Sequence, residues 1–361
     1  MDFKSILIKW YGQNARVLPW RQTSDPYHIW VSEVILQQTR VAQGLDYYLR
    51  FIEAFPTIQS LAEAPLDALM KVWQGLGYYS RARNMQAGAQ MVMERFGGKL
   101  PSTYNQLITI KGLGPYSAGA IASFAFKQQV PAIDGNVYRI LARIFGVFAS
   151  PFTAGGKKEF HQLVMELMDK EAPDTFNQAL LDFGALQCVP RSPNCNECPF
   201  VGICYAYRNN LIDQLPVKGK KLIPKDRFFN YIMVKHAGNT YINRREASDI
   251  WNSLYEFPLI ETQEMLAPEA IMVLPQWVEV VGKGDVVVRY VSEVFKHKLS
   301  HQTINARFFI VELTVVPYSL KSKYQKAPMG TLSNLSTPRL IDSFLAAEPA
   351  SVYFHGTNTG D

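Results

Sequence analysis

The pattern of apolar and polar positions changes character part-way along this chain of 361 residues. As far as residue 210, apolar stretches with helical spacing alternate with capping residues and glycines. Asp25-Pro26 is typical of an N-cap followed by proline at the first helical position, Pro65 opens a further helix, and Ser102 is placed to cap another. Glycines mark the expected helix ends at Gly75, Gly77, Gly97, Gly98, Gly112 and Gly114. The pattern predicts a compact all-α region over residues 1–210.

A basic linker is predicted next, at residues 211–227. Its cations are Lys218, Lys220, Lys221, Lys225 and Arg227, and two prolines interrupt it. A solvated connector and a contact with a phosphate backbone explain this composition equally well.

The remaining sequence, residues 228–361, is strand-like. Residues 231–234 and 240–242 flank Gly238-Asn239, which is a two-residue hairpin signal. Further β-branched and aromatic stretches lie at 286–291 and 308–316, and a closing helix is expected at 338–346. These elements predict a second domain of the α+β class.

Bulk properties narrow the class of protein only a little. The length accommodates two or three domains, and an apolar content of 48% is sufficient for sizeable cores. No apolar run approaches the ~20 residues that a membrane-spanning helix needs. The formal charge of +6 weakly favours a polyanionic partner. The first twenty residues lack the apolar segment and cleavage site of a secretory signal, so we expect a cytoplasmic protein.

All four cysteines of the chain fall in one short segment, with spacing C-x6-C-x2-C-x5-C: Cys188, Cys195, Cys198 and Cys204. Without an oxidising compartment, such clustering indicates metal ligands rather than disulfides. Zinc sites usually pair their ligands as two short C-x2-4-C arms, and here only Cys195 and Cys198 are that close. The spacing therefore favours a [4Fe–4S] cluster over a zinc ion, without excluding zinc.

Two glycine turns are candidates for nucleic-acid contact. In the first, Gly112 and Gly114 join two short predicted helices at about residues 102–126, and proline starts the second helix, so free backbone N–H groups can bind a phosphate. A glycine C-cap between packed helices explains the same residues equally well. The second turn begins at Gly75 and continues into Tyr78 and Tyr79 with nearby arginines, a combination suited to wedging into a duplex or, alternatively, to packing in a core.

Two carboxylates have surroundings suited to general acid and anion roles. Glu33 is the only charged residue in the apolar stretch 29–39, so its pKa should be raised and it should hold a proton near neutrality. A solvent-facing glutamate with an ion-pair partner is the alternative. Asp134 precedes a predicted helix as an N-cap, and the helix end should keep it ionised. A proton donor opposite a stabilised anion is the pair that cleavage of a glycosidic bond requires.

Together these segments resemble the helix–hairpin–helix DNA glycosylase superfamily, in which cysteines at this spacing hold a [4Fe–4S] cluster. Four motifs are similar to those of its MutY-type adenine DNA glycosylases: L-P-W-R at 18–21, W-V-S-E-V-I-L-Q-Q-T at 30–39, G-L-G-Y-Y at 75–79 and D-G-N at 134–136. The match covers roughly residues 1–210. It implies double-stranded DNA as the partner and removal of adenine mispaired with 8-oxoguanine or guanine.

The resemblance also implies roles for individual residues. Glu33 protonates the adenine, Asp134 stabilises the sugar cation, and Tyr116 and Asn136 support the site. The adenine pocket is expected to be lined by Trp20, Arg21, Leu36 and Val41, with Arg16 and Gln178 as weaker candidates. Gln38 and Tyr79 are expected to wedge near 8-oxoguanine, Thr39, Leu76 and Ser300 to contact it, and the backbone of Gly112 and Gly114 to hold phosphates.

One position separates this chain from endonuclease III-type relatives, which carry a lysine where Tyr116 stands. Since a phenol cannot form a Schiff base, we expect a monofunctional glycosylase with at most trace lyase activity.

The second domain resembles the MutT-type Nudix fold. The stretch at 251–258 is similar to W-x-x-L-[WY]-E-F-P, but the metal-binding carboxylate series of an active Nudix hydrolase does not follow. The domain is therefore expected to recognise 8-oxoguanine rather than to hydrolyse a nucleotide. The segment Leu299-Ser300-His301 resembles the family's Phe-Ser-His loop, with leucine in place of the stacking phenylalanine.

The complete prediction is a multidomain protein, an all-α helix–hairpin–helix glycosylase domain with an iron–sulfur loop followed by an α+β Nudix-like domain. We expect a monomer associated with the nucleoid of a bacterium-like cell. The alternatives are an endonuclease III-like enzyme acting on oxidised pyrimidines, a non-catalytic zinc-containing DNA-binding module and, less well matched, an iron–sulfur electron carrier.

Overall fold

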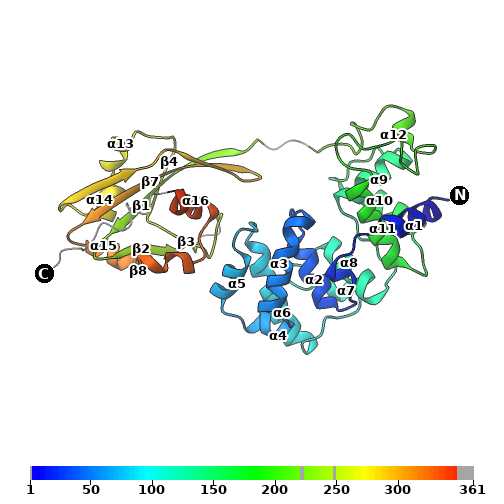
Figure 1. The fold of residues 1–361 in the computed structure, drawn as a ribbon, viewed down its shortest axis with the longest axis horizontal. Coiled ribbons are helices and arrows are strands. Elements are labelled where there is room, and N and C mark those ends of the chain that lie inside the picture. The colour runs from blue at the N-terminus through cyan, green and yellow to red at the C-terminus, as the bar shows by residue number, and fades with distance from the viewer. Residues whose placement is uncertain (1, 220–222, 247–248, 348–361) are drawn as a thin grey trace. The chain divides into compact units, whose positions relative to one another are not determined.

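The computed structural model describes residues 2–219, 223–246 and 249–347 (Figure 1). The chain forms two compact units. The first comprises Met1–Ala64 and Arg81–Lys220, and the second comprises Pro65–Ser80 and Lys221–Asp361. The boundary differs from the sequence prediction, which placed residues 65–80 with the helical region.

The first unit is helical, as the sequence predicted. Its elements, together with α5 of the second unit, are α1 (Phe3–Asn14), η1 (Pro19–Arg21), α2 (Pro26–Ile35), α3 (Val41–Ala54), α4 (Ile58–Glu63), α5 (Leu66–Trp73), α6 (Ser80–Phe96), α7 (Tyr104–Leu107), α8 (Pro115–Phe126), α9 (Gly135–Phe145), α10 (Ala154–Leu167), α11 (Pro173–Leu186) and α12 (Tyr205–Arg208).

Local capping explains where several of these helices begin. The Asp25 side chain accepts a hydrogen bond from the backbone N–H of Tyr27 at 2.8 Å, and Pro26 occupies the first turn of α2, as predicted. Pro65 is the N-cap of α5. The expected cap at Ser102 is displaced by one residue, because Thr103 holds the N-cap position of α7 and makes no side-chain capping bond.

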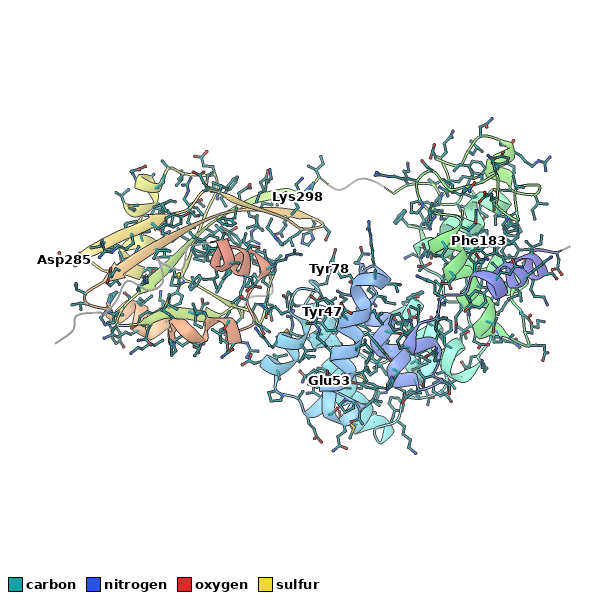
Figure 2. All side chains as sticks on the ribbon, in the orientation of Figure 1. Tyr47, Glu53, Tyr78, Phe183, Asp285 and Lys298 are labelled. Atoms are coloured by element: carbon teal, nitrogen blue, oxygen red, sulfur yellow. The ribbon has the colours of Figure 1, made fainter. Side chains whose placement is uncertain are left out.

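A core of α1, α9, α10 and α11 supports the part of the first unit that carries the cysteines. Phe183 of α11 (labelled in Figure 2) is fully buried there and packs edge-to-face against Phe200, with ring centroids 5.1 Å apart. Cys204 is part of this core, and Cys188 and Cys198 pack against it. The cysteine loop is thereby held to the helices that precede it.

The second unit is α+β, again as predicted. Its remaining elements are β1 (Lys225–Lys235), β2 (Asn239–Arg244), β3 (Tyr255–Glu256), β4 (Leu259–Thr262), α13 (Pro268–Met272), α14 (Pro275–Val281), β5 (Val286–Val291), β6 (Phe295–Lys298), β7 (Gln302–Leu313), α15 (Tyr318–Lys323), β8 (Gln325–Pro328), η2 (Met329–Asn334) and α16 (Arg339–Ala347). One sheet has the order β4-β1-β7-β5 with β6 also paired to β7, and a smaller sheet has the order β3-β2-β8. Strand β1 starts inside the segment that was expected to be linker.

Strands β1 and β7 form the centre of the larger sheet and are covered on both faces. They pair in parallel, from Lys225 with Gln302 to Lys235 with Glu312. On one face, Phe308 of β7 stacks on Phe344 of α16 at 4.0 Å; on the other, Phe309 packs edge-to-face against Trp277 of α14. Because successive side chains of a strand point to opposite faces, two separate cores result.

The predicted hairpin turn lies one residue earlier than expected. Ala237 and Gly238 are its central residues, both with positive φ (46° and 73°), and His236 and Asn239 exchange backbone hydrogen bonds at 3.0 Å. Positive φ at both central positions is the geometry of a type I′ turn. The turn passes the chain from β1 in the larger sheet to β2 in the smaller one.

Helix α5 belongs to the second unit because its polar face binds there. Asp67 forms an ion pair with Arg244 at 3.1 Å and accepts a hydrogen bond from the Tyr255 hydroxyl at 3.2 Å. The Gln74 amide donates to Asp342 of α16 at 2.8 Å. The hydrophobic spacing of residues 66–73 is sufficient to predict a helix. The partners of α5 could not be predicted, because they are distant in the sequence.

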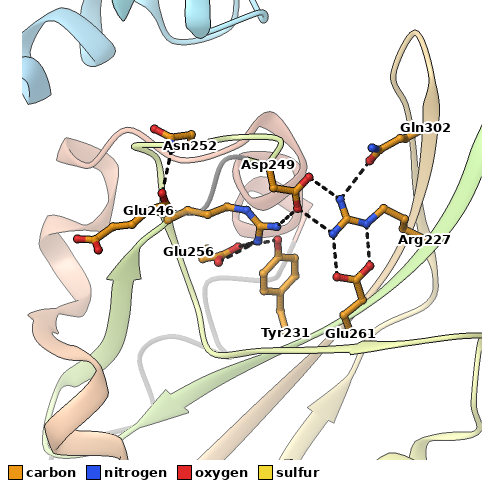
Figure 3. A network of polar contacts seen from close by, with 9 residues as sticks. Arg227, Tyr231, Glu246, Asp249, Asn252, Glu256, Glu261 and Gln302 are labelled. Carbon is orange, nitrogen blue, oxygen red and sulfur yellow. Dashed lines mark hydrogen bonds and ion pairs between the residues drawn. The ribbon is translucent and has the colours of Figure 1, made fainter.

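A network of charged groups joins β1, the segment after β2, and β4 (Figure 3). Arg227 donates to both oxygens of Glu261 at 2.7 Å and to Asp249 at 2.9 Å, and Arg245 bridges Asp249 to the buried Glu256. These contacts fix the segment that carries Trp251, whose ring lies 5.8 Å from that of His297 in β6. Across the described ranges, no helix combines the length and apolar content needed to cross a lipid bilayer.

Candidate active site

A cavity of about 430 Å³ in the first unit brings together residues from η1, α2, α8 and α11, from the first turns of α3 and α9, and from the segments that precede these helices. This volume lies within the roughly 300–1,000 Å³ of small-molecule sites. All of the residues predicted for catalysis and the adenine pocket line it: Arg16, Trp20, Arg21, Glu33, Leu36, Val41, Tyr116, Asp134, Asn136 and Gln178. Thr39, which was predicted to contact 8-oxoguanine, also lines the cavity.

Glu33 lies in the last turn of α2, where the neighbouring positions are almost all buried, and its own exposed fraction is 8%. Burial raises the pKa of its carboxyl group to about 7. A side-chain hydrogen bond with Tyr116 and the charge of Arg21 oppose the rise, and Asp134 adds to it. The group can therefore carry a proton into the cavity near neutral pH.

Asp134 is the N-cap of α9. Its carboxylate accepts hydrogen bonds from the backbone N–H groups of Asn136 at 2.8 Å and Val137 at 3.0 Å, and from the Asn136 amide at 2.7 Å. Burial raises the pKa of this carboxyl group even though these bonds and Arg139 lower it, so the capping effect expected from the sequence does not dominate. Three donors hold the carboxylate in one orientation at the cavity wall.

Asn136 connects this cap to the cysteine loop. Its side-chain oxygen accepts from Arg139 at 2.8 Å, and Arg139 also donates to the carbonyl oxygen of Cys188 at 2.7 Å. Asn136 therefore bridges Asp134 and Arg139.

Two arginines, Arg16 and Arg21, make part of the cavity wall basic. Arg16 and Arg21 both bind the carboxylate of Asp182 in α11, and Gln178, one turn earlier in α11, accepts a hydrogen bond from the Tyr11 hydroxyl at 3.0 Å. No local pattern points to Asp182, because its partners lie more than 160 residues away in the sequence.

The helix–hairpin–helix predicted at about residues 102–126 is formed by α7 and α8. Gly112 has a φ of 88°, and a Cβ there would lie 3.0 Å from Asn84, so a side chain would not fit. Gly114 is the N-cap of α8 with a φ of −92° and open space around its Cβ position. The left-handed backbone conformation therefore requires glycine only at position 112. Gly114 has no such requirement, but it leaves the start of α8 accessible to a ligand.

All four cysteines lie in the first unit, on the loop that follows α11 and ends at the start of α12. Burial, followed by the influence of neighbouring cysteines, raises the pKa of the Cys195 thiol, and burial raises the pKa of Cys198 to about 12. Arg143 contacts two of the cysteines: its guanidinium lies 3.5 Å from Cys188 Sγ, and its carbonyl oxygen accepts from Cys204 Sγ at 3.4 Å.

The spacing of these thiols bears on the metal they can hold. In the part of the chain that the structure describes, no three Cys, His, Asp or Glu side chains converge closely enough for a single metal ion. In a [4Fe–4S] cluster each thiolate binds a different iron atom, which requires a wider arrangement. Four thiols in one loop supply the number of ligands that a [4Fe–4S] cluster takes.

The residues predicted for 8-oxoguanine contact lie outside the cavity, apart from Thr39. Gln38 is exposed and has a positive φ of 61°, while Leu76 is largely buried. Leu299, Ser300 and His301 form the turn between β6 and β7 in the second unit.

The two adjacent tyrosines differ in exposure, and the exposed ring is Tyr78 rather than Tyr79. The predicted wedge, Tyr79, is buried, with an exposed fraction of 7%, and its hydroxyl accepts from the Gly75 N–H at 3.3 Å. Tyr78 (labelled in Figure 2) is 50% exposed, has a φ of 48°, and its hydroxyl lies 3.2 Å from Ser300 Oγ. Nothing in the sequence distinguishes the two rings, because both follow the same glycine turn.

Comparisons with known proteins agree with both units. Residues 31–167 match the HhH-GPD superfamily of base excision DNA repair proteins, and residues 230–347 match the NUDIX domain. The adenine DNA glycosylase of Buchnera aphidicola subsp. Baizongia pistaciae (strain Bp) is 34% identical over 310 residues, which cover 84% of each chain. The chain belongs to the adenine DNA glycosylase family. The predicted family, the two-part fold class and the enzyme class are thereby confirmed.

Solved structures show how widely the glycosylase fold is shared. A thermostable thymine-DNA glycosylase superposes with a TM-score of 0.54 at 26% identity, covering 57% of this chain and 95% of its own. An endonuclease III trapped on DNA superposes with a TM-score of 0.51 at 22% identity, covering 58% of this chain and 95% of its own. The fold alone therefore does not separate this family member from endonuclease III-type enzymes.

Proposed function

We propose that this family member hydrolyses the N-glycosidic bond of adenine mispaired with 8-oxoguanine or guanine in duplex DNA, without cleaving the strand. The observation that carries the proposal is the pairing of Glu33 and Asp134 on the wall of one cavity, with Tyr116 in place of an amine nucleophile. Base-excision repair by adenine removal follows from the family.

Recognition of the duplex uses elements outside the cavity. The accessible start of α8 at Gly114 can bind a backbone phosphate, which positions the protein without reading sequence. The adenine must leave the base stack to enter the cavity, because its glycosidic bond cannot be reached inside the duplex. We propose that Gln38 and Tyr78, both exposed, occupy the space next to 8-oxoguanine, and that Thr39 and the Leu299–His301 turn contact that base.

In the chemical step, Glu33 donates its proton to N7 of the adenine. The electron pair of the C1′–N9 bond moves to the base, which leaves as neutral adenine, and the sugar becomes an oxocarbenium-like cation. Asp134 stabilises that cation across the cavity. Water then adds to C1′ and gives its proton to the Glu33 carboxylate, which restores the acid. Proton donation contributes on the order of 10²–10⁴-fold to the rate, and electrostatic stabilisation contributes the remainder.

Cys188, Cys195, Cys198 and Cys204 would hold a [4Fe–4S] cluster. When bound, the cluster would cross-link the loop and would add no electron to a hydrolytic reaction. Arg143 ties the same loop to residues that follow it, through bonds to the carbonyl oxygens of Val189 at 2.8 Å and Leu215 at 3.1 Å. Iron and sulfide analysis of the purified protein, together with the visible absorbance that zinc lacks, tests this assignment.

The partners and location follow from the substrate. We propose that the protein acts as a monomer on double-stranded DNA and is associated with the nucleoid in the cytoplasm. Sedimentation of the protein with and without a mispaired duplex measures the stoichiometry.

The decisive experiment incubates the protein with a duplex that contains adenine opposite 8-oxoguanine, followed by alkali. We expect cleavage at the adenine position only after alkali, and none in a duplex with cytosine opposite 8-oxoguanine. Cleavage of a duplex that contains an oxidised pyrimidine, without alkali, would instead support the endonuclease III-like alternative.

A further inference from the structure

Behind the two arginines that line the cavity lies a buried carboxylate that the proposed chemistry does not use. Asp182 of α11 has no exposed side-chain surface and accepts five hydrogen bonds, all from Arg16 and Arg21. Its Oδ1 atom lies 2.8 Å from Arg16 Nε and 2.8 Å from Arg21 Nη2, and its Oδ2 atom accepts from the Arg16 backbone N–H at 3.2 Å. A carboxylate with this many donors is saturated and fixed in place.

The same contacts orient the two arginines. Arg16 presents Nε and one terminal nitrogen to the carboxylate, whereas Arg21 presents both terminal nitrogens. Because a guanidinium group is planar, fixing one edge also fixes the direction of the remaining N–H donors. Arg16 and Arg21 both line the cavity, and Arg21 Nη1 also donates to the Arg16 carbonyl oxygen at 3.5 Å, so the donors outside these bonds can face a base held there.

Asp182 also influences the protonation of Glu33, because its negative charge offsets a nearby positive charge. Burial alone would raise its pKa, but the hydrogen bonds and charges of Arg21 and Arg16 outweigh burial, and the pKa of Asp182 is lowered. The ionised carboxylate therefore offsets one of two cations next to the acid. Glu33 meets Tyr116 from α8, Arg21 from η1 and Asp134 from the start of α9. An uncompensated cation at Arg21 would favour the ionised form of Glu33, which cannot donate a proton.

We propose that Asp182 is a positioning residue of this site. It holds the guanidinium groups of Arg16 and Arg21 on the cavity wall and offsets their charge, so that they meet the extruded adenine with fixed donors while Glu33 keeps its proton. The inference rests on the proposed function, since it assigns the basic wall to the purine that Glu33 protonates.

The test measures single-turnover adenine release against pH for the full-length protein and for Asp182→Asn. We expect the variant to bind the mispaired duplex but to release adenine on the order of 10²-fold more slowly, because small displacements of positioning groups have effects of this size. We also expect the alkaline limb of its pH profile to move to lower pH by about half a unit to one unit. The double variant Arg16→Met/Asp182→Asn, which restores the net charge, should move the limb back towards that of the unmodified protein.

Asp174→Asn is the matched control. Asp174 lies in the same helix and is buried, but it is ion-paired with Lys127 rather than with Arg16 or Arg21. We expect this variant to have the pH profile of the unmodified protein. If Asp182→Asn unfolds, Arg16→Met alone provides the measurement, and its alkaline limb should move to higher pH.

A pH profile that is unchanged in Asp182→Asn and in Arg16→Met would overturn the assignment. Carboxyl-¹³C NMR titration of Glu33 in the free proteins, with Glu33→Gln identifying the signal, measures the same shift without substrate. Inactivity of the unmodified protein on mispaired adenine would contradict the proposed function, whereas an unchanged Glu33 titration in Asp182→Asn would contradict only the role of Asp182.

Discussion

The Tyr116 hydroxyl group hydrogen-bonds the carboxyl group of Glu33. Burial, followed by the negative charges of Glu33 and Asp134, raises the pKa of Tyr116 well above its usual value. The phenol therefore stays protonated and can donate to the carboxyl group. The residue that replaces the lysine of endonuclease III-type relatives thus contacts the proposed acid directly.

This contact leads to a prediction for Tyr116→Lys. An amine at the wall of the cavity should attack the sugar at C1′, and borohydride should then trap a covalent protein–DNA adduct that the unmodified protein does not form in quantity. Gel electrophoresis after borohydride treatment measures the adduct. Tyr116→Phe, which lacks both the hydroxyl and an amine, is the control; abundant trapping by the unmodified protein would contradict monofunctional chemistry.

Replacement of the acid should separate binding from catalysis. Glu33→Gln keeps the size of the side chain but cannot donate a proton, so adenine release should fall by at least ~10²-fold while the affinity for the mispaired duplex changes little. In the unmodified protein, release should decline as the pH rises through about 7, because burial raises the pKa of Glu33 to about 7. Single-turnover rates across the pH range test both statements, and normal release by Glu33→Gln would remove Glu33 from the mechanism.

Because the pKa of Glu33 is raised, the free energy of unfolding should fall as the pH rises to neutrality. The pKa rises from 4.5 to about 7 on folding, so the folded state holds the proton more tightly than the unfolded state does. This contribution to stability is complete below pH 4.5 and is lost as the pH rises through 7. At ~1.4 kcal/mol per pKa unit, the loss amounts to about 3 kcal/mol.

The melting temperatures of Glu33→Gln and of the unmodified protein should therefore differ less at pH 4.5 than at pH 8. At pH 8 the variant should be the more stable of the two. Calorimetry at both pH values measures the difference. Glu63→Gln, at an exposed position near the end of α4, is the control and should show no such dependence. Equal differences at both pH values for Glu33→Gln would mean that the carboxyl group is not buried in solution.

The two tyrosines after the second glycine turn should differ in their effects on binding. Tyr78→Ala removes the exposed ring and should weaken binding to a duplex with 8-oxoguanine opposite a non-cleavable adenosine analogue by about 10–10²-fold, since stacking on one base contributes ~1–3 kcal/mol. Tyr79→Phe keeps the buried ring and should bind nearly as the unmodified protein does. Fluorescence anisotropy measures both affinities, and the reverse ranking would restore Tyr79 as the wedge.

The sequence predicted most of the cavity because the relevant residue types have local signatures. A lone glutamate in an apolar helix and an aspartate N-cap indicate Glu33 and Asp134 without reference to tertiary structure, and the family motifs add the pocket residues. Asp182 escaped notice because its function depends on Arg16 and Arg21, at the other end of the helical unit's sequence.

Errors of one residue had local causes. The hairpin turn lies at Ala237-Gly238 rather than Gly238-Asn239, because a type I′ turn needs positive φ at two consecutive positions and alanine adopts the first. Tyr78 is exposed and Tyr79 is buried because the start of α6 at Ser80 decides which ring faces the core, and the sequence does not fix that start to one residue.

Helix α5 has a consequence for how the molecule is made. Asp67 and Lys71 leave the ribosome early, whereas their partners Arg244 and Ser333 are translated much later. The helical unit, including all four cysteines, is complete before β1 is synthesised, and early segments generally fold first. Order of synthesis and order of assembly therefore diverge at this helix, which is among the first to emerge and among the last to reach its final contacts.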